Sequence, residues 1–572
     1  MKRKSLTTAI LAGLTGMAGM VSVSNAVNLN PDGLGQVLLF PYYSARGGND
    51  TLISIVNTTD QVKALKIRFH EALNSREVLD FNIYMSPWDV WTAAVTDAAD
   101  GRGQLITADT TCTAPYFQGG VLDAAGNPVP GFVPMVDFQY NSDPVDTTGD
   151  GVFDFIGTID GPAAIRGLER TLSGYIEVVE MGNIDPTATL LWNSAKHTTA
   201  GVPPSGGNFG ATCSRITDRW RRDVVPPDCA GSSSQPGFWQ FCDSSADMIP
   251  VSGGVFGNAS IINVAEGTKF SYEAVALDGF WSVGTVFHTD PGDVAPSLAA
   301  GNVNTSLVFN NGVLDEVEWP ASIFAVNHTL TFNRMMNEYM IDAGLGARSE
   351  WVVTMPTKRF HTDAAAGGPN PGLAAPVPPF TDRWIWPDPS RPSAAQKPFS
   401  CETLQLRVWD REEQEPTTTT GICPGGVIIN GICISPPPPP TPGQPGFQLC
   451  REANVIRFSN DDSIPGVSEI FKEPRRADVA GGRLGYTNFD LPAAFGAGWV
   501  RFDMNDKVSV IGERPNGQEV RAFGLPVAGF WAQRFANELV EFPVGSGEQV
   551  LSNYGGTFSH RGSRRLENFV SP

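Results

Sequence analysis

Apolar and polar residues alternate along two neighbouring segments near the N-terminus. In VKALKIRFH (62–70), Leu65, Ile67 and Phe69 alternate with basic side chains, and VLDFNIYM (78–85) shows the same alternation. Successive side chains of a β-strand point to opposite faces, so a period of two predicts a strand with one buried face. Both segments are therefore predicted to form half-buried antiparallel strands.

The flanking sequence extends this pattern. QVLLFPYY (36–43), TLISIVN (51–57) and WDVWTAAV (88–95) are further short apolar segments, and turn-forming residues such as those at 46–50 separate them. Several short strands at a spacing of about ten residues, with turns between them, are typical of a β-sandwich. The predicted fold class is mainly β and antiparallel, with long loop insertions and little helix.

One segment has helical spacing instead. Phe332, Met335, Met336, Tyr339 and Met340 fall at i, i+3, i+4, i+7 and i+8, which places them on one face of a helix. This spacing predicts a short helix packed on the core, in preference to a methionine-rich metal or ligand site.

The composition changes along the chain and suggests a division into domains. Gly, Asp, Thr and Pro predominate in one early segment, Ala, Gly and Pro in a later one, and a third contains four consecutive threonines and five consecutive prolines. Proline-rich tracts form extended, solvated chain and do not supply a packed core. We predict a β-sandwich at 27–180 with an insertion at about 97–170, a second β-rich region at 181–362, a linker at 363–400, and a C-terminal β-sandwich at 401–572 with a Thr/Pro-rich insertion at about 415–446.

Several stretches resemble known proteins. TLISIVNTT (51–59), followed by an amphipathic strand, resembles the immunoglobulin-like sandwich modules of exported bacterial proteins, and GWVRFDM (498–504) resembles a closing strand of such a module. YIEVVEMG (175–182), LGARSEWVVTMPTKRF (345–360) and SNYGGTFSHR (552–561) are similar to a group of long, functionally uncharacterised exported proteins of Gram-negative bacteria. The resemblance implies immunoglobulin-like sandwiches and a cell-surface or periplasmic location, and it implies no known activity.

The first 26 residues have the organisation of a signal peptide. A basic cluster, Lys2-Arg3-Lys4, precedes an apolar run from about Leu6 to Val23. Ser24-Asn25-Ala26 then supplies the small residues that signal peptidase requires. We therefore expect export from the cytoplasm and a mature N-terminus at Val27, in preference to a transmembrane anchor.

The charge balance restricts the classes of partner. The chain contains 60 acidic and 40 basic residues, and removal of the basic leader makes its net charge more negative than −20. A net negative protein repels nucleic-acid phosphates and anionic membrane surfaces. No later segment approaches the 18 uninterrupted apolar residues that a spanning helix needs. We expect neither a nucleic-acid partner nor a transmembrane segment in the mature chain.

All the cysteines lie after the predicted leader. An even number of cysteines in an exported chain predicts up to four disulfides, and sequence alone does not determine their pairing. A zinc site is disfavoured because no paired CxxC motif is present. Cys423 and Cys433 bracket a short segment and are the first pair we expect. The candidates are Cys112, Cys213, Cys229, Cys242, Cys401, Cys423, Cys433 and Cys450.

A short acidic segment is the sharpest candidate for a metal site. In DTTGDGVFD, Asp146, Thr148, Asp150 and Asp154 have the spacing of oxygen ligands in a calcium loop, and a glycine occupies the tight turn. The twelfth position is Gly157 rather than an acidic residue, so the bidentate ligand would have to come from elsewhere. Two interpretations stay open, a Ca²⁺ site and a solvated turn.

Motifs for catalysis are missing from the sequence. It has no HExxH, no GxSxG, no P-loop and no GxGxxG that opens a helix. A glycosidase with a pair of carboxylates stays open, because sequence does not show which acidic residues meet. The histidines have no evident partners, and each is expected to be a surface or strand-exposed residue. They are His70, His197, His288, His328, His361 and His560.

Four tryptophans are flanked by Asp and Arg and are candidates for sugar contact. They are Trp220, Trp384, Trp386 and Trp409. Flat rings beside polar side chains stack on sugars, although the same arrangement occurs where tryptophan packs in a core or against arginine.

We therefore expect an exported, non-enzymatic cell-surface or periplasmic protein with a structural or adhesive task. Its partner would be another copy of the chain or a surface glycan. An extracellular polysaccharide-binding protein is the second expectation, and an exported hydrolase is the third.

Overall fold

The computed structural model describes most of the chain. The described residues are 26–115, 121–122, 128–129, 131–135, 168–197, 210–310, 312–363, 376–383, 399–415, 427–429, 432–434, 448–461, 465–475, 485–537, 539–541 and 545–570.

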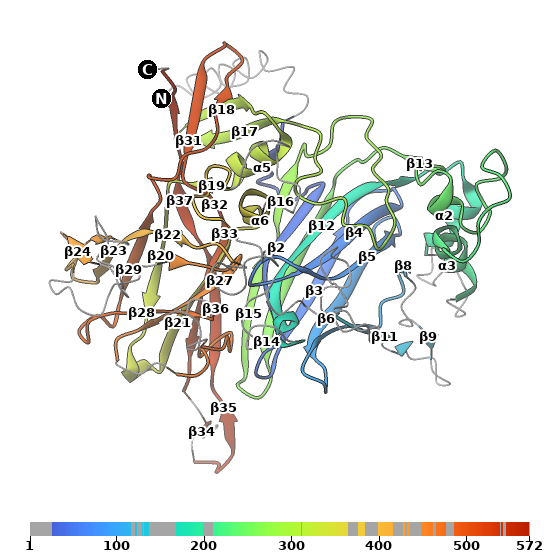
Figure 1. Cartoon of the computed structure of the whole chain (residues 1–572). Helices are drawn as coiled ribbons and strands as arrows, with labels where there is room; N and C mark the ends of the chain where they lie inside the picture. Colours follow the sequence, from blue (N-terminus) through green and yellow to red (C-terminus); the bar gives the residue numbers. More distant parts are fainter. Residues whose placement is uncertain are drawn as a thin grey trace, which may run out of the picture.

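The fold is mainly β and largely antiparallel, as predicted. Two sandwiches lie side by side, the first in blue to green and the second in yellow to red in Figure 1. Each sandwich has an outer sheet and an inner sheet, and the inner sheet packs against the other sandwich. Residues 268–273 at the edge of the first outer sheet also contact residues 554–559 of the second inner sheet.

The first sandwich is built around a core of aliphatic and aromatic side chains between its two sheets, among them Phe40, Phe69, Phe81 and Trp91. Its inner sheet has the order β1 (Asn28–Leu29), β16 (Val275–Asp278), β2 (Val37–Ser44), β12 (Ser173–Ile184), β4 (Lys63–Glu71), β5 (Glu77–Met85) and β8 (Cys112–Ala114), and β13 (Met248–Ile249) also pairs with β12. Its outer sheet has the order β11 (Gly131–Pro134), β7 (Gly103–Thr107), β6 (Val90–Asp97), β3 (Asn49–Asn57), β14 (Val255–Asn263) and β15 (Thr268–Glu273).

The second sandwich has its own core, which includes Tyr339, Trp351, Phe458, Phe502 and Trp531. Its inner sheet has the order β28 (Thr487–Asp490), β27 (Ala453–Ser459), β21 (Ala347–Thr354), β33 (Ala528–Phe535) and β36 (Tyr554–Ser559). Its outer sheet has the order β24 (Val427–Ile429), β25 (Ile432–Ile434), β23 (Gln405–Asp410), β29 (Ala497–Asp503), β20 (Arg334–Met340) and β37 (Arg561–Ser563).

Smaller elements surround the two sandwiches. A third sheet has the order β17 (Thr305–Asn310), β18 (Val313–Glu318), β30 (Gly512–Glu513), β31 (Glu519–Phe523) and β38 (Arg565–Asn568). The helices include α2 (Thr189–Ala195), α3 (Gly210–Thr217), α4 (Phe238–Phe241), α5 (Ser322–Leu330) and α6 (Lys358–Thr362). Short paired strands are β9 (Val121–Leu122) with β10 (Pro128–Val129), β19 (Thr331–Phe332) with β32 (Leu525–Pro526), β22 (Glu402–Thr403) with β26 (Gln448–Leu449), and β34 (Leu539–Glu541) with β35 (Gln549–Leu551).

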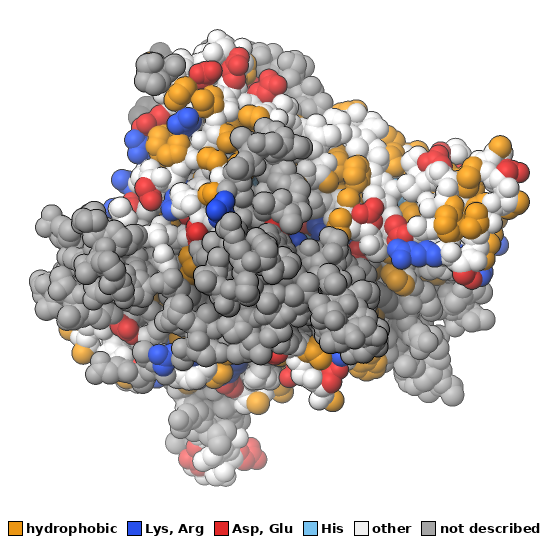
Figure 2. Space-filling view, in the orientation of Figure 1, with side chains coloured by type: hydrophobic (Ala, Val, Ile, Leu, Met, Phe, Trp, Pro, Cys, Tyr) orange, Lys and Arg blue, Asp and Glu red, His pale blue; other side chains and the backbone are white. Residues whose placement is uncertain are grey.

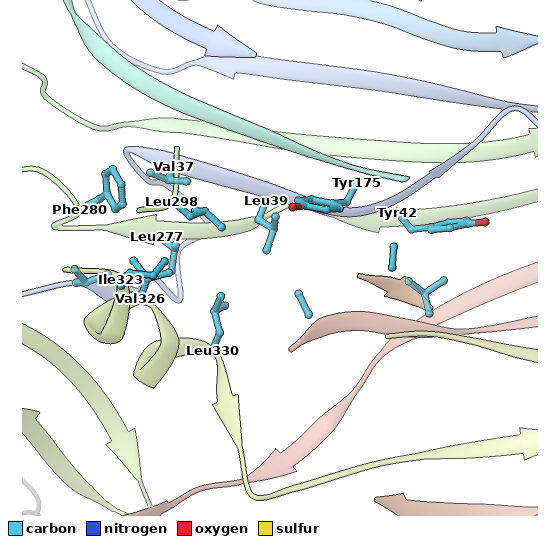
Figure 3. Close-up of a cluster of buried hydrophobic side chains, with 14 of the residues drawn as sticks. Val37, Leu39, Tyr42, Tyr175, Leu277, Phe280, Leu298, Ile323, Val326 and Leu330 are labelled. Carbon is cyan, nitrogen blue, oxygen red and sulfur yellow. The ribbon is translucent and has the colours of Figure 1, made fainter. Parts of the chain in front are cut away.

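A third apolar core joins the two sandwiches. Leu39 and Tyr175 of the first inner sheet belong to the same buried cluster as Val352 and Phe530 of the second. Helix α5 adds its apolar side chains to this cluster, and Figure 3 shows Ile323, Val326 and Leu330 of the helix facing the first inner sheet. Because a buried aliphatic or aromatic side chain contributes about 1.5–3 kcal/mol, this contact binds the sandwiches into one body.

The loop at 465–475 lies between the sandwiches. Ile470 and Phe471 are buried in the central cluster, and the backbone carbonyl of Phe471 accepts a hydrogen bond from Ser44 Oγ of the first sandwich (3.1 Å). On the other side, the carboxylate of Glu350 in β21 accepts hydrogen bonds from the amides of Ile470 (2.8 Å) and Phe471 (3.0 Å). Burial, together with the smaller effect of neighbouring Glu469, raises the pKa of Glu350 to about 7. The loop is thus held from both sandwiches.

An ion-pair cluster crosses the same interface. The carboxylate of Glu473 accepts hydrogen bonds from the Tyr42 hydroxyl (2.8 Å) and the Arg451 guanidinium (2.8 Å) and lies 3.5 Å from Arg46. Its pKa falls to about 2 because the attraction of Arg451 and Arg46 outweighs the cost of burial. Tyr42 and Arg46 belong to the first sandwich, whereas Arg451 and Glu473 belong to the second. Loss of one partner would leave a buried charge, which typically costs about 3–5 kcal/mol.

The prediction that β4 and β5 are half-buried is wrong, because every residue of both strands is buried. The polar face of β4 is covered by the loop after β16, where Lys66 Nζ donates to the backbone carbonyls of Asp290 (2.5 Å) and Pro291 (2.9 Å). Burial, together with the smaller effect of Glu77 beside it, raises the pKa of Asp80 to about 8. Period-two alternation separates the two faces of a strand but does not show whether a polar face meets water.

The helix predicted for residues 332–340 is also wrong, because this segment forms β19 and β20. Strand β20 pairs with β29 on one side and β37 on the other. Met335 and Tyr339 do point into the core. Their separation of four residues places them on one side of a helix and equally on one side of a strand, so the pattern could not distinguish the two.

The strands of the predicted 181–362 region are divided between the sandwiches. Strands β14 to β16 complete the first sandwich, and β20 and β21 belong to the second. Within the 97–170 insertion, β7, β8 and β11 are regular members of the first sandwich. In the 363–400 linker, Val377 and Phe380 are buried in two of the cores. Within 415–446, β24 and β25 extend the second outer sheet.

Three disulfides join six of the candidate cysteines. They are Cys112–Cys213, Cys229–Cys242 and Cys401–Cys450. Cys112–Cys213 links the segment that carries α2, α3 and α4 to strand β8, and Cys229–Cys242 closes a loop within that segment. The expected Cys423–Cys433 pair lies outside the residues whose side chains are described.

We expect Phe471→Ala to lower the free energy of unfolding by about 3–5 kcal/mol, because it leaves a cavity between the sandwiches. The control is Val467→Ala in the same loop, whose side chain is 49% exposed and whose loss should cost about 0.5 kcal/mol or less. Denaturant unfolding followed by tryptophan fluorescence measures both. Equal effects of the two variants would contradict a stabilising role for the loop.

Candidate functional site

The four candidate tryptophans have different environments. Trp220 is 7% exposed and packs against Trp239 and His288, so it belongs to a core and is not available for sugar contact. Trp384 and Trp386 lie outside the described residues. Trp409 is half-buried on the outward face of the second outer sheet, in β23. Of the candidates that the structure describes, only Trp409 remains for contact with a partner.

Trp409 has a partner that sequence reasoning missed. Strand pairing places Trp499 of β29 directly opposite it, and the two rings stack with centroids 4.1 Å apart and an interplanar angle of 12°. Both strands alternate between buried residues and residues with partial exposure, so both rings lie on the solvent side of the sheet. The two rings therefore form a single aromatic unit.

Two arginines extend this unit. Arg407 and Arg501 are also directly opposite each other, two residues along each strand from the tryptophans. Their guanidinium carbons lie 4.9 Å and 5.4 Å from the Trp409 ring centroid. A cation over an indole ring is attracted by about 0.5–1 kcal/mol at exposed sites. This attraction orients the guanidinium planes.

Carboxylates compensate the arginine charges. Arg501 donates through Nε and Nη2 to Asp503 (3.1 and 2.9 Å), and Arg334 of β20 donates to the other oxygen of the same carboxylate (3.0 Å). Arg407 pairs with Glu415. Planar donors and acceptors thus alternate around the aromatic unit. We name the set Trp409, Trp499, Arg407, Arg501, Asp503, Arg334 and Glu415 the Trp–Arg platform.

The Trp–Arg platform combines two features of polar-ligand recognition. Its half-buried rings offer apolar contact, and the fixed guanidinium and carboxylate groups provide donors and acceptors whose orientation is set before binding. Its three guanidinium groups exceed its two carboxylates by one charge, so the net attraction for a strongly anionic ligand is small. A neutral ligand with many hydroxyl groups and apolar C–H faces fits this chemistry.

The outward face of the other outer sheet is different. A shallow depression of about 380 Å³ lies over β3, β6, β7 and β14, and it is lined by small apolar residues and by hydroxyl and amide groups such as Ser54, Thr92 and Asn258. Its lining contains neither an aromatic nor a charged side chain. Figure 2 shows acidic and basic side chains interspersed over the described part of the face in view. The Trp–Arg platform is therefore the stronger candidate.

The predicted calcium ligands Asp146, Thr148, Asp150 and Asp154 lie outside the described residues. Among the residues that are described, no group of three or more His, Cys, Asp or Glu side chains could hold a metal ion. Calcium therefore stays a prediction from the sequence.

The expectation that the histidines are exposed is wrong for most of them. His70, His288, His328 and His361 are at most 6% exposed. His560 is half-buried, and its Nε2 bonds to the Val352 carbonyl (2.8 Å). A lone histidine gives no signal for burial in the sequence, because its partners come from other strands and helices.

Burial favours the neutral form of His288, His328, His361 and His560. In α6, His361 bonds to the Val377 carbonyl through Nδ1 (3.2 Å) and to the Asn327 amide through Nε2 (2.8 Å). Burial lowers the pKa of His288, His361 and His560 to about 4, and that of His328 to about 3. Both ring nitrogens of His361 are thus occupied within the protein, which favours a structural role.

Comparisons of the chain with protein-family models, with curated proteins and with solved structures found no match in any of the three. Among the described residues, none of the helices has the length and apolar character to cross a membrane.

We expect His361→Gln to reduce the loss of stability at acid pH. A histidine in the unfolded chain takes up a proton near pH 6.5, whereas His361 in the folded protein does so only near pH 4. The contribution of His361 to the free energy of unfolding is therefore complete above pH 6.5 and is lost as the pH falls from 6.5 to 4. Relative to the wild type, the variant should therefore gain stability as the pH falls from about 6.5 to 4. Denaturant unfolding at several pH values measures this difference. A difference that is independent of pH would contradict the prediction.

Proposed function

We propose that the protein is an exported, non-enzymatic binding protein of the cell surface or periplasm, and that the Trp–Arg platform contacts a neutral polysaccharide. The stacked pair of Trp409 and Trp499 between oriented arginines carries the proposal. This combines the adhesive task expected first from the sequence with the glycan partner expected second.

The platform lies on a rigid support, which favours binding. Strand β29 is paired on both sides, and the reverse faces of β23 and β29 contribute Val408, Val500 and Phe502 to the second core. A site on paired strands loses little conformational entropy when a ligand binds. Repeated sugar units would further allow several molecules to engage one polymer, which increases retention.

Export has support besides the leader sequence. Three disulfides are typical of proteins outside the reducing cytoplasm. Val27, the proposed first residue of the mature chain, is completely buried, and its nitrogen donates to the Thr305 carbonyl (2.8 Å). Cleavage before Val27 would keep this donor and place the new N-terminus against β17.

A non-enzymatic role is favoured by the position of the ionisable groups. Carboxylates do meet on the first inner sheet, where Glu77 and Glu177 both lie beside Arg68. However, both carboxylates are at most 3% exposed, and the ion pairs occupy them. This arrangement stabilises the fold and offers a sugar no approach.

We expect Trp409→Ala and Trp499→Ala each to weaken retention on a neutral polysaccharide about tenfold, equivalent to ~1.4 kcal/mol. Affinity electrophoresis through gels that contain soluble β-glucan, α-glucan or galactomannan, with an acidic polysaccharide for comparison, measures retention. Trp88→Ala is the matched control, because Trp88 is 70% exposed and lies far from the platform in sequence and sheet. The proposed ligand class would be contradicted if the wild type migrated freely in every neutral gel. It would also be contradicted if the substitutions weakened retention only in the gel that contains the acidic polysaccharide.

We expect the exported protein to begin at Val27 when it is produced in a Gram-negative host. N-terminal sequencing and intact-mass measurement of the protein from the periplasmic or extracellular fraction identify its first residue. Ala26→Lys should block cleavage because signal peptidase requires a small residue at that position. Recovery of uncleaved wild-type protein from the cytoplasm only would contradict export.

A further inference from the structure

A cavity of about 140 Å³ opens at the seam between the two sandwiches. The first sandwich contributes Pro41, Tyr272 and Val275 to its lining, and the second contributes Met335 and Phe530. Ligand sites occur preferentially at interfaces between structural units. The volume is close to that of an apolar protein cavity of about 150 Å³ that binds benzene.

The deep part of the cavity is apolar. Leu330, Met335, Val527 and Phe530 are at most 3% exposed. Tyr272 stacks on Phe530 with centroids 4.7 Å apart and an interplanar angle of 21°, which gives the cavity an aromatic wall. A flat aromatic ring would find both area and offset stacking against such a wall.

The polar groups within the lining are already bonded elsewhere. The Tyr272 hydroxyl donates to the Tyr42 carbonyl, and His560 bonds through Nε2 to Val352 (2.8 Å) and through Nδ1 to Asn337 (3.1 Å). A ligand deep in the cavity therefore needs no polar group to satisfy them. Polar contacts with a ligand are therefore expected at the mouth of the cavity.

The mouth carries an acidic group. Glu273 and Ser559 line the cavity and are exposed. The nearby Arg564 lies over the Phe332 ring (4.8 Å), and its guanidinium donates to the backbone carbonyls of His328 (3.0 Å), Thr329 (2.7 Å) and Thr331 (2.8 Å). It does not line the cavity. Among the Asp, Glu, Lys and Arg residues that the structure describes, Glu273 alone lines this cavity.

We propose that this seam cavity binds a small aromatic amine, with its ring against Tyr272 and Phe530 and its ammonium group at Glu273. The ring occupies the dry interior, while the charged end stays at the exposed mouth, where an ion pair costs little desolvation. The site is independent of polysaccharide binding, since none of its lining residues belongs to the Trp–Arg platform.

The full mature chain provides the test, with phenethylamine as the probe and 3-phenylpropionate as its anionic counterpart. Isothermal titration and saturation-transfer NMR should show saturable binding of phenethylamine, at least tenfold tighter than 3-phenylpropionate. Ala528→Leu places additional carbon atoms in the cavity and should abolish binding. Glu273→Gln should bring the two affinities to within about threefold while the aromatic ring still binds.

Glu273 is exposed, so its variant tests the proposal even if Ala528→Leu fails to fold. Circular dichroism and thermal unfolding establish whether each variant is folded. The proposal is overturned by the absence of saturable phenethylamine binding to the wild type, or by unchanged binding to folded Ala528→Leu. Equal wild-type affinity for the amine and the acid, or an unaltered preference in Glu273→Gln, would also overturn it.

Discussion

The packing of one inner sheet against the other is the contact on which the rest of the structure depends. It joins apolar side chains from both sandwiches and from helix α5 in one continuous core. The same contact encloses Glu473 with Tyr42 and Arg451, and Glu350 with the amides of the 465–475 loop. Buried ionised groups need partners, so these bonds set the relative position of the sandwiches as well as adding stability.

This central contact also decides which surfaces can meet a partner. Because the inner sheets largely cover each other, the two outer sheets present the accessible faces of the two sandwiches. One carries small apolar and hydroxyl side chains, and the other carries the Trp–Arg platform. The seam cavity lies where the two sandwiches meet, and both contribute to its lining, for example Tyr272 from the first and Met335 from the second. The proposed binding surface and the proposed cavity site therefore lie on different parts of the fold.

The disulfides support segments that the sheets alone do not hold. Cys112–Cys213 joins helix α3 to strand β8, and Cys229–Cys242 closes a loop beside α4. The aromatic cluster of Tyr84, Trp239 and His288 lies under this helical segment and completes its core. Disulfides that close loops restrict the unfolded chain, which favours persistence in an oxidising compartment.

The sequence by itself determined the strands, because alternation along β4 and β5 depends only on local side-chain order. It could not determine that the polar faces of these strands are buried, since their partners come from a distant loop. It could not separate strand from helix at Met335 and Tyr339, because a spacing of four residues satisfies both periods. The neighbours of Trp409 suggested a ligand contact, but Trp499 became its partner only through the register of β23 with β29. Tertiary structure decided these points, because strand pairing and burial depend on residues far apart in the chain.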